Sequence, residues 1–412
     1  MRIGLLTQWF DPEPGPAALP GVLARGLVAR GHEVQVLTGF PNYPSGTIAD
    51  GYRVRPRTDE HRDGVDIRRT ALYASHDASA VRRFANYASF GLSAATLGVG
   101  ALRQVDAVWV NYSPITTAWP MWTNQLLHRV PSVVHVLDLW PDTVLAGGFG
   151  RDDAAGGLAQ RVLHAWCNRM YRTAASVAYI SPGVGSVLQD RGVPRDKLAY
   201  VPMWADESLF RPAPDSLRPE LGVDADQVVL LYAGALGEAQ GLESLVEACA
   251  LVRDPRFVCL VAGSGTAEES LRRRADELSL TNLRFLGRVP SERMTALTAA
   301  ADLAYIGLRP HPLSSVTMPS KTQANLAAGK PLLVAATGDV ADVARDSGAA
   351  FVTEDLAPAA IAATIEAACR PGRDGLRELG AKARSYYEHT FSVDEGVRRI
   401  EGLLLDAAGS RP

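Results

Sequence analysis

The hydrophobic positions of this chain fall into short, nearly continuous runs, separated by longer stretches with helical spacing. Runs of this kind, rich in Val, Ile and Leu, are typical of strands buried on both faces of a parallel sheet. The alternation of such strands with helices predicts an α/β fold with crossover helices. The predicted strands are 2–8, 33–39, 106–111, 132–137, 176–180 and 198–202 in the first half, and 227–234, 257–263, 283–287, 302–307, 331–335 and 349–352 in the second.

Two sets of strands predict two doubly wound, Rossmann-like domains, because 412 residues are too many for one hydrophobic core. The Pro-rich polar stretch 210–222 separates the sets and marks the join. We therefore expect an N-terminal domain over 1–212 and a C-terminal domain over 213–390. The amphipathic stretch 392–408 predicts a final helix, within 391–412, that packs back toward the first domain.

Composition narrows the class of protein. A hydrophobic content of 47% with 21% charged residues predicts a folded globular protein, and a net charge of −3 gives no general attraction to nucleic acid. No apolar run is long enough for a membrane span, so we expect a cytoplasmic protein. The four separated cysteines predict core thiols, and neither a metal site nor a cofactor is expected.

The stretch 308–335 carries the strongest sign of a ligand site. Pro319 and Gly329 are the expected boundaries of a helix, so Ser320 and Lys321 are predicted at its N-terminus. Free N–H groups and the helix dipole make this end suitable for a phosphate. The alternative is an ordinary crossover helix with a solvated lysine.

Two glycine-rich turns follow predicted strands of the second domain. YAGALGEAQGLESL contains Gly234 and Gly237, and VAGSGTAEESL contains Gly263 and Gly265. Both turns permit close approach of a phosphate, but neither has the lysine of a P-loop or dinucleotide-binding spacing. The triplet 224–226, DAD, resembles a metal-binding motif, yet it precedes a strand and is better interpreted as a solvated turn.

In the first domain the loops after two strands are candidates for an acceptor site. The long Pro/Gly loop after the first strand, which includes Gly15, could hold an acceptor or close over a donor phosphate. Asp138 and Asp142 follow the strand 132–137, where a carboxylate can bind or deprotonate a sugar hydroxyl. Helix capping by Asp142, a structural role for Asp138 and simple packing of Trp140 are the alternatives to acceptor contacts.

Taken together, these motifs resemble the family 4 retaining glycosyltransferases of the GT-B fold, in which two Rossmann-like domains face a central cleft. Within that family the chain is similar to the bacterial N-acetyl-fucosamine transferase type of surface-polysaccharide synthesis. The resemblance extends from residue 3 to about 340 and includes QWFDPEPG, DLWPD, YISPGV, VPMWADESLF, FLGRVPSERM, DLAYIGLRP and MPSKTQANLAAGKP. It implies metal-independent transfer of an N-acetylated amino or 6-deoxy hexose from a UDP-sugar to an acceptor hydroxyl.

The resemblance also implies roles for individual residues. Asp138 and Lys321 are predicted to be catalytic, with Lys321 as the main cation at the diphosphate and Arg309 as the second choice. Asp138, Trp140 and Asp142 are predicted to contact the acceptor. The predicted donor-binding residues are Gly15, Gly234, Gly237, Gln240, Gly263, Gly265, Arg288, Val289, Arg309, Ser314, Ser315, Val316, Ser320 and Lys321.

Several positions depart from the family pattern. Many members carry two Glu residues in the donor loop and helix, a His before the acceptor-side Asp, an Arg and a Lys in the first glycine-rich turn, and an Asn near the hinge. The matching residues here are Val316 and Ala324, Leu137, Ala235 and Gln240, and Met203. A nucleotide-sugar-binding protein without catalysis is therefore one alternative, and a sugar-nucleotide epimerase or dinucleotide enzyme is another.

The acceptor is predicted to be a polyprenyl-linked glycan at the cytoplasmic membrane face, with a soluble natural product as the alternative. Arginines crowd the first domain and could contact anionic lipid, although a solvated surface explains them as well. They are Arg53, Arg55, Arg57, Arg68, Arg69, Arg82 and Arg83.

Overall fold

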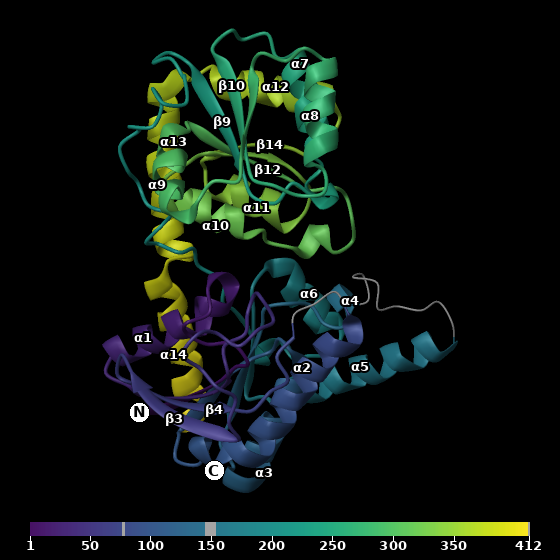
Figure 1. The fold of residues 1–412 in the computed structure, drawn as a ribbon, viewed down its shortest axis with the longest axis vertical. Coiled ribbons are helices and arrows are strands. Elements are labelled where there is room, and N and C mark those ends of the chain that lie inside the picture. Colours follow the sequence, from purple (N-terminus) through teal and green to yellow (C-terminus); the bar gives the residue numbers. More distant parts are fainter. Residues whose placement is uncertain (76–78, 145–153, 411–412) are drawn as a thin grey trace. The chain divides into compact units, whose positions relative to one another are not determined.

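The computed structural model describes residues 1–75, 79–144 and 154–410, and the chain forms two compact units (Figure 1). Unit 1 comprises Met1–Val201 and Gly396–Pro412, and unit 2 comprises Pro202–Glu395. The chain thus enters unit 2 earlier than the boundary predicted at 212/213. The reason is that Ala205 is buried in the core of unit 2, where its N–H donates to the Tyr387 hydroxyl at 3.2 Å.

Unit 1 contains a sheet with the strand order β3-β4-β2-β1-β5-β6-β7-β8. All six strands predicted for this half of the chain are present, and only β3 runs antiparallel, against β4. The β3–β4 hairpin was not predicted, because β3 has the exposed, charged sequence RTDEHR and no hydrophobic run. The strands are β1 (Arg2–Leu6), β2 (Glu33–Gly39), β3 (Arg57–Arg62), β4 (Val65–Thr70), β5 (Ala107–Asn111), β6 (Ser132–Val136), β7 (Ser176–Tyr179) and β8 (Leu198–Tyr200).

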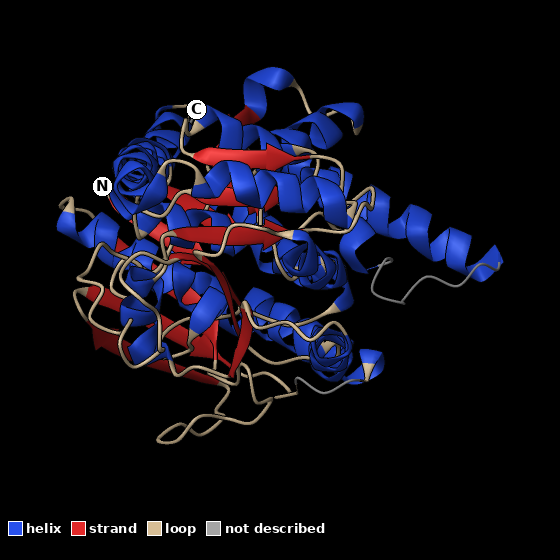
Figure 2. Cartoon of the chain, turned by 90° about the horizontal axis from the view of Figure 1, so that it is seen from above, coloured by secondary structure: helices blue, strands red, loops and turns tan. Residues whose placement is uncertain are grey.

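Helices flank the strands in the chain as a whole (Figure 2). In unit 1 every residue of β5 and β6 is buried. The C-terminal helix belongs mostly to this unit: Glu401 accepts from His32 Nε2 at 2.7 Å and forms an ion pair with Arg30 at the end of α1. The helices are α1 (Leu19–Ala29), α2 (Ala80–Ser93), α3 (Ala118–His128), α4 (Asp142–Val144), α5 (Ala154–Thr173), α6 (Pro182–Asp190) and α14 (Val393–Gly409).

Unit 2 contains a parallel sheet with the strand order β11-β10-β9-β12-β13-β14. All six predicted strands are present as β9 (Val228–Ala233), β10 (Phe257–Ala262), β11 (Leu283–Gly287), β12 (Leu303–Gly307), β13 (Leu332–Ala335) and β14 (Ala350–Thr353). The helices are α7 (Leu242–Leu251), α8 (Glu268–Glu277), α9 (Ser291–Ala300), α10 (Ser320–Ala327), α11 (Asp339–Asp346), α12 (Pro358–Cys369) and α13 (Gly372–Thr390). The four cysteines are buried and unpaired, as expected of core thiols.

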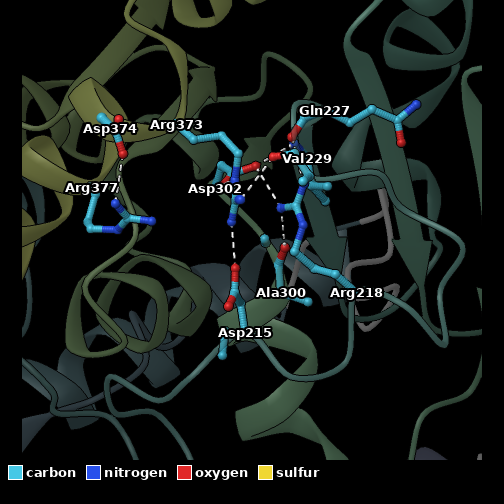
Figure 3. A network of polar contacts seen from close by, with 12 residues as sticks. Asp215, Arg218, Gln227, Val229, Ala300, Asp302, Arg373, Asp374 and Arg377 are labelled. Carbon is cyan, nitrogen blue, oxygen red and sulfur yellow. Dashed lines mark hydrogen bonds and ion pairs between the residues drawn. The ribbon is translucent and has the colours of Figure 1, made fainter.

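A charged network closes the amino-terminal edge of this sheet (Figure 3). Asp302, just before β12, accepts from Arg218 at 3.1 Å and from Arg373 at 3.0 Å. The same two arginines donate to the backbone carbonyls of Asp224 and Ala225 at 2.9 and 3.0 Å. The DAD triplet is therefore part of a structural turn held by two cations, at the end of the sheet opposite to the strand carboxyl ends.

Candidate active site

The strand order of unit 2 reverses between β9 and β12, because the chain proceeds from β9 to β10 and β11 on one side and from β12 to β13 and β14 on the other. Loops at the carboxyl ends of two such strands diverge and leave a crevice, which is where open α/β sheets bind ligands. The loops concerned are 234–241 after β9 and 308–319 after β12. This switch point is the candidate donor site.

The glycine-rich turns after β9 and β10 pack against each other. A methyl group on Gly263 would lie 1.8 Å from the carbonyl oxygen of Gly234, and one on Gly265 would lie 2.3 Å from that of Leu236. The N–H of Gly234 already donates to Ala262 O at 2.9 Å, and that of Gly263 to Gly287 O at 2.7 Å. These two N–H groups are thus used within the protein, and the glycines allow the close contact of two backbones, while donor binding at Gly234 and Gly263 stays a prediction.

The side chain of Gln240 has a structural role in this turn. Its Oε1 accepts from the N–H of Gly237 at 3.1 Å, so the side chain folds back and holds the turn together. The backbone N–H of Gly237 is therefore also hydrogen-bonded within the protein. Both residues shape the turn, and their contact with the donor stays a prediction.

Two cations from other elements stand at the two ends of this turn. A methyl group on Gly234 would lie 2.8 Å from Lys321 Cε and 3.0 Å from its Nζ, and one on Gly241 would lie 3.2 Å from Arg309 Cγ. The N–H of Arg309 donates to the carbonyl of Ala239 at 2.9 Å, which fixes its backbone beside the turn. The turn has no cation of its own, and Lys321 and Arg309 bring positive charge to it from the β12–α10 connection.

Lys321 lies in an environment with little to balance its charge. Its Nζ donates to the Tyr232 hydroxyl at 2.6 Å and lies 4.0 Å from the centroid of that ring. No carboxylate pairs with it among the described residues. Burial lowers the pKa of the Lys321 ammonium from 10.5 to about 8. An anionic ligand at this position would supply the missing counter-charge.

The start of α10 adds backbone donors to Lys321. The helix covers Ser320–Ala327, which confirms its predicted start after Pro319, and Pro319 provides no side-chain cap. The first N–H groups of such a helix have no partner within it, and the dipole places partial positive charge there. Ser320 is exposed, so this end is open to a ligand. Lys321 and the helix terminus thus form one anion site.

The remaining predicted donor residues surround this site less closely. Arg288 is exposed just after β11, and Val289 packs partly into the core of unit 2. Ser314, Ser315 and Val316 form a single 3₁₀ turn in the loop after β12. Arg309 forms an ion pair with Glu243 at 3.2 Å, but half of its side chain remains exposed. These positions remain predictions for the base and sugar.

In unit 1 the sheet places Asp138 two residues beyond the end of β6. One carboxylate oxygen accepts from Ser113 Oγ, in the loop after β5, at 3.0 Å. Asp138 as a whole residue is exposed, but protein atoms surround its carboxyl group. This partial burial raises the pKa of Asp138, and the hydrogen bond from Ser113 opposes part of that rise. A carboxylate that is both accessible and raised in pKa can accept or orient a hydroxyl proton.

Asp142 does not offer a free carboxylate to an acceptor. It forms an ion pair with Arg191, whose side chain is one-tenth exposed and which also donates to the carbonyl of Trp140 at 2.8 Å. This pair ties the loop after β6 to the end of α6. The ion pair gives Asp142 a positioning role, and its contact with an acceptor stays a prediction.

Aromatic side chains line the loops near Asp138. The ring of Tyr87 lies 6.3 Å from Trp140 and 6.2 Å from Trp9, both in edge-to-face geometry, and Trp9 lies 6.3 Å from Tyr43. Burial raises the pKa of Tyr87, and the nearby charge of Asp138 adds to that rise. The four rings are half-buried and form one aromatic cluster.

Glu13 organises the first loop, although no sequence motif pointed to it. Its buried carboxylate accepts from the N–H groups of Phe10, Asn42 and Tyr43 at 3.0, 2.7 and 2.9 Å. Burial raises the pKa of Glu13, and the three backbone donors oppose that rise. The loops after β1 and β2 are thereby held together, while Gly15 is exposed with open space around its Cα.

The family models that match the chain agree with this arrangement. A glycosyl transferase 4-like domain matches residues 15–204, and a glycosyl transferases group 1 domain matches residues 215–385. The structure is similar to sucrose-phosphate synthase from Thermosynechococcus elongatus, with a TM-score of 0.72, 18% identity and 99% of each chain covered. It is also similar to Anabaena HepE in complex with UDP, with a TM-score of 0.67, 18% identity, and 98% of this chain and 100% of that one covered.

The fold is therefore GT-B, as the sequence predicted. The chain belongs to the group 1 glycosyltransferases and carries a glycosyl transferase 4-like domain in unit 1. Its relatives include an Escherichia coli K12 protein provisionally named colanic acid biosynthesis glycosyl transferase WcaI, which is 24% identical over 95% of this chain and 96% of that protein. A D-inositol 3-phosphate glycosyltransferase of Geodermatophilus obscurus is 28% identical over 70% of this chain and 62% of that protein.

Proposed function

We propose that this protein is a retaining hexosyltransferase that transfers an N-acetylated amino or 6-deoxy sugar from a UDP-sugar to a hydroxyl of a lipid-linked glycan. The observation that supports the donor class is the pair of cations, Lys321 and Arg309, beside the glycine-rich turn at the switch point of unit 2. Two cations and a helix N-terminus match the two phosphates of a diphosphate. The name of WcaI supports surface-polysaccharide synthesis, and the UDP complex of HepE supports the base.

The proposed chemistry is front-face displacement. The bond between the sugar C1 and the diphosphate oxygen breaks, the acceptor oxygen bonds to C1 on the same face, and the acceptor proton passes to the leaving diphosphate. Lys321 and the α10 N-terminus stabilise the charge that builds on the diphosphate, while Asp138 orients the acceptor hydroxyl. This scheme requires no protein nucleophile.

The function is tested by offering a panel of UDP-, GDP- and dTDP-sugars with and without a lipid-linked acceptor extract and measuring nucleotide release and glycosylated product. We expect UDP release that depends on the acceptor, and product that retains the anomeric configuration of the donor. Release from GDP- or dTDP-sugars alone would overturn the assigned base. An inverted product would overturn the mechanism.

A nucleotide-sugar-binding protein without catalysis is the second candidate, and one observation favours it. Val316 and Ala324 occupy positions where many relatives carry Glu, and neither side chain can hydrogen-bond a sugar or ribose hydroxyl. In that case UDP and UDP-sugars would bind, but no product would form with any donor or acceptor. The product assay separates the two candidates.

UDP is expected to bind without a metal ion, because the cationic side chains and the helix N-terminus supply the positive charge that a divalent ion would otherwise provide. Calorimetric titration of UDP in EDTA and in Mg²⁺ checks this. Affinities within about threefold of each other are expected. Loss of binding in EDTA, with recovery on addition of Mg²⁺, would show that the diphosphate is held through a metal.

UDP affinity is also expected to depend on alkaline pH. The pKa of Lys321 is lowered to about 8, so in the free protein this side chain loses its charge as the pH rises through 8, whereas an ordinary lysine stays charged until about 10.5. A bound diphosphate favours the charged form, so binding above pH 8 must be accompanied by proton uptake. Titration from pH 7 to 9.5 should show affinity falling toward tenfold per pH unit. A flat profile would mean that Lys321 does not contact the diphosphate.

A further inference from the structure

Exposed large apolar side chains gather on one helical layer of unit 1. Val81 and Leu126 are 78% and 81% exposed, and Leu158 is 64% exposed. Within the described part of unit 2, Leu251 is the one residue of this kind. Eight exposed large apolar residues lie on α2, on the π-helical turn that follows α2, on α3 and on α5. They are Val81, Phe84, Leu92, Leu97, Leu126, Leu127, Leu158 and Val162.

The three helices lie side by side in unit 1 (Figure 1). At Gly91 of α2 an added methyl group would lie 2.7 Å from the Trp119 ring of α3. Trp166 of α5 packs against both Trp119 and Trp122 of α3, with ring centroids 5.8 and 4.8 Å apart, and the Trp122 indole donates to Thr173 Oγ1 of α5 at 3.0 Å. The exposed apolar residues therefore belong to one layer, which we name the α2–α3–α5 face.

The charge of this face is one-sided. The helices contain 14, 11 and 20 residues and no Asp or Glu, although the chain has 45 acidic residues in all. Asp77 before α2, and Asp152 and Asp153 before α5, lie outside the described residues. The basic side chains of the three helices are Arg82, Arg83, Arg161, Arg169 and Arg172. An ordinary solvated surface would carry charges of both signs.

Tryptophan and arginine meet on the same face. Trp119, Trp122 and Trp166 are half-buried, and the Arg169 guanidinium lies 4.6 Å from the centroid of the Trp122 ring. Indole rings favour the boundary between lipid headgroups and acyl chains, and arginine can extend to the phosphates above apolar neighbours. The apolar, Trp and Arg side chains of this face are more typical of a surface in contact with a lipid bilayer than of one exposed to water.

The structure also excludes two of the arginines first considered for lipid contact. Arg69 is fully buried, forms an ion pair with Glu60 and donates to the carbonyl of Gly39 at 3.0 Å. Arg68 is paired with Asp59 across the β3–β4 hairpin at 2.6 Å. Both stabilise the hairpin, so the hairpin arginines are a poor basis for a membrane contact.

We propose that the α2–α3–α5 face docks onto a bilayer that contains anionic lipid. Its arginines complement anionic headgroups, and its Leu, Phe and Val side chains enter the boundary with the acyl chains. A symmetric dimer through this face would bring like charges together, since neither copy has a carboxylate on these helices to pair with the arginines. Among the described helices none is long and apolar enough to cross a membrane.

This inference deepens the proposed function and rests on it in part, because a lipid-linked acceptor would require the enzyme to work at a membrane. Vesicle binding is measured without donor or acceptor, so the two proposals can fail separately. Vesicle binding without product formation would support the membrane-docking face and contradict the proposed reaction. Product formation without vesicle binding would support the reaction and contradict the membrane-docking face.

The test uses the full chain and sedimentation with vesicles of phosphatidylcholine, alone or with 30% phosphatidylglycerol. We expect binding to the anionic vesicles at least about tenfold tighter than to the neutral ones, with a fall at high salt. Arg161→Gln should weaken it about fivefold, and Phe84→Ser with Leu126→Ser by more than about tenfold. Leu251→Ser is the matched control and should bind like the parent.

Thermal unfolding and UDP titration of each variant show whether the fold and donor site are intact. Equal binding of parent and Phe84→Ser/Leu126→Ser to anionic vesicles would overturn the proposal. So would failure of the parent to bind anionic vesicles at all. A concentration-dependent dimer in light scattering that the double variant abolishes would assign the face to a second copy instead.

Discussion

Replacing Lys321 by Met is expected to make the protein more stable and almost inactive. The ammonium group is partly buried beside Tyr232, and no carboxylate pairs with it among the described residues. Burying this charge lowers the stability of the folded protein, whereas an apolar side chain of similar length carries no such cost. We therefore expect the Lys321→Met variant to unfold at a midpoint about 2–8 °C above that of the parent. Loss of the charge at the leaving diphosphate should lower turnover by about 10² to 10³.

The stability difference should depend on pH with a definite sign. Because burial lowers the pKa of Lys321 in the folded protein to about 8, the unfolded chain holds more protons between pH 8 and 10.5. The contribution of Lys321 to the free energy of unfolding of the parent therefore increases as the pH rises from about 8 to about 10.5. The advantage of Lys321→Met should be largest below pH 8 and should vanish by about pH 10.5.

Lys330 provides a matched control in the same unit. Burial lowers its pKa to about 8 as well, but its Nζ donates to the carbonyls of Ala299 and Ala301 at 3.1 and 2.7 Å, next to the amino ends of β12 and β13. Lys330→Met breaks both bonds and should lower stability while leaving UDP affinity unchanged. If Lys321→Met behaved like Lys330→Met, Lys321 would be a structural lysine. If Arg309→Ala alone impaired turnover, the diphosphate would be held by the preceding loop.

Asp138→Asn is expected to abolish most transfer without affecting the donor. The substitution keeps the shape of the side chain and a hydrogen-bond acceptor for Ser113, but it removes the negative charge that orients the acceptor hydroxyl. Groups in this role contribute about 10² to 10⁴ in rate. Steady-state turnover should fall by that factor, while UDP affinity by calorimetry stays within about twofold, because Asp138 lies in unit 1 and the cations assigned to the diphosphate, Lys321 and Arg309, lie in unit 2.

Asp142→Asn separates a catalytic from a positioning carboxylate. Its ion pair with Arg191 holds the loop after β6, so the variant should lower the unfolding midpoint and impair turnover less than Asp138→Asn. Full activity of Asp138→Asn would return Asp138 to a structural role. An equal loss in both variants would indicate that the loop geometry, and not the Asp138 charge, limits transfer.

The fold was predictable from the sequence because the strands are buried and each forms a nearly uninterrupted run of apolar residues. All twelve predicted strands are present, as is the helix after Pro319. The β3–β4 hairpin escaped prediction because cross-strand ion pairs such as Arg68 with Asp59, and not a hydrophobic run, hold β3 in place. A two-residue Asp63-Gly64 turn was the available signal.

The candidate site was predicted only in outline. Lys321 follows from a Pro boundary and a helix pattern, but its contact with Tyr232 depends on the neighbouring strand β9 and leaves no trace in the spacing. The glycine-rich turns were recognised correctly as special backbone, yet their N–H groups at Gly234 and Gly263 are used inside the protein. Glycine spacing alone does not distinguish close backbone packing from phosphate binding.

Hydrogen–deuterium exchange with UDP, compared with uridine, tests the location of the diphosphate most directly. Protection that UDP gives and uridine does not must come from the phosphates. We expect it in peptides covering 234–241 and 308–322, the two loops at the switch point of unit 2 with the start of α10. Phosphate-dependent protection confined to other segments, with no change at 308–322, would contradict the anion site assigned to Lys321.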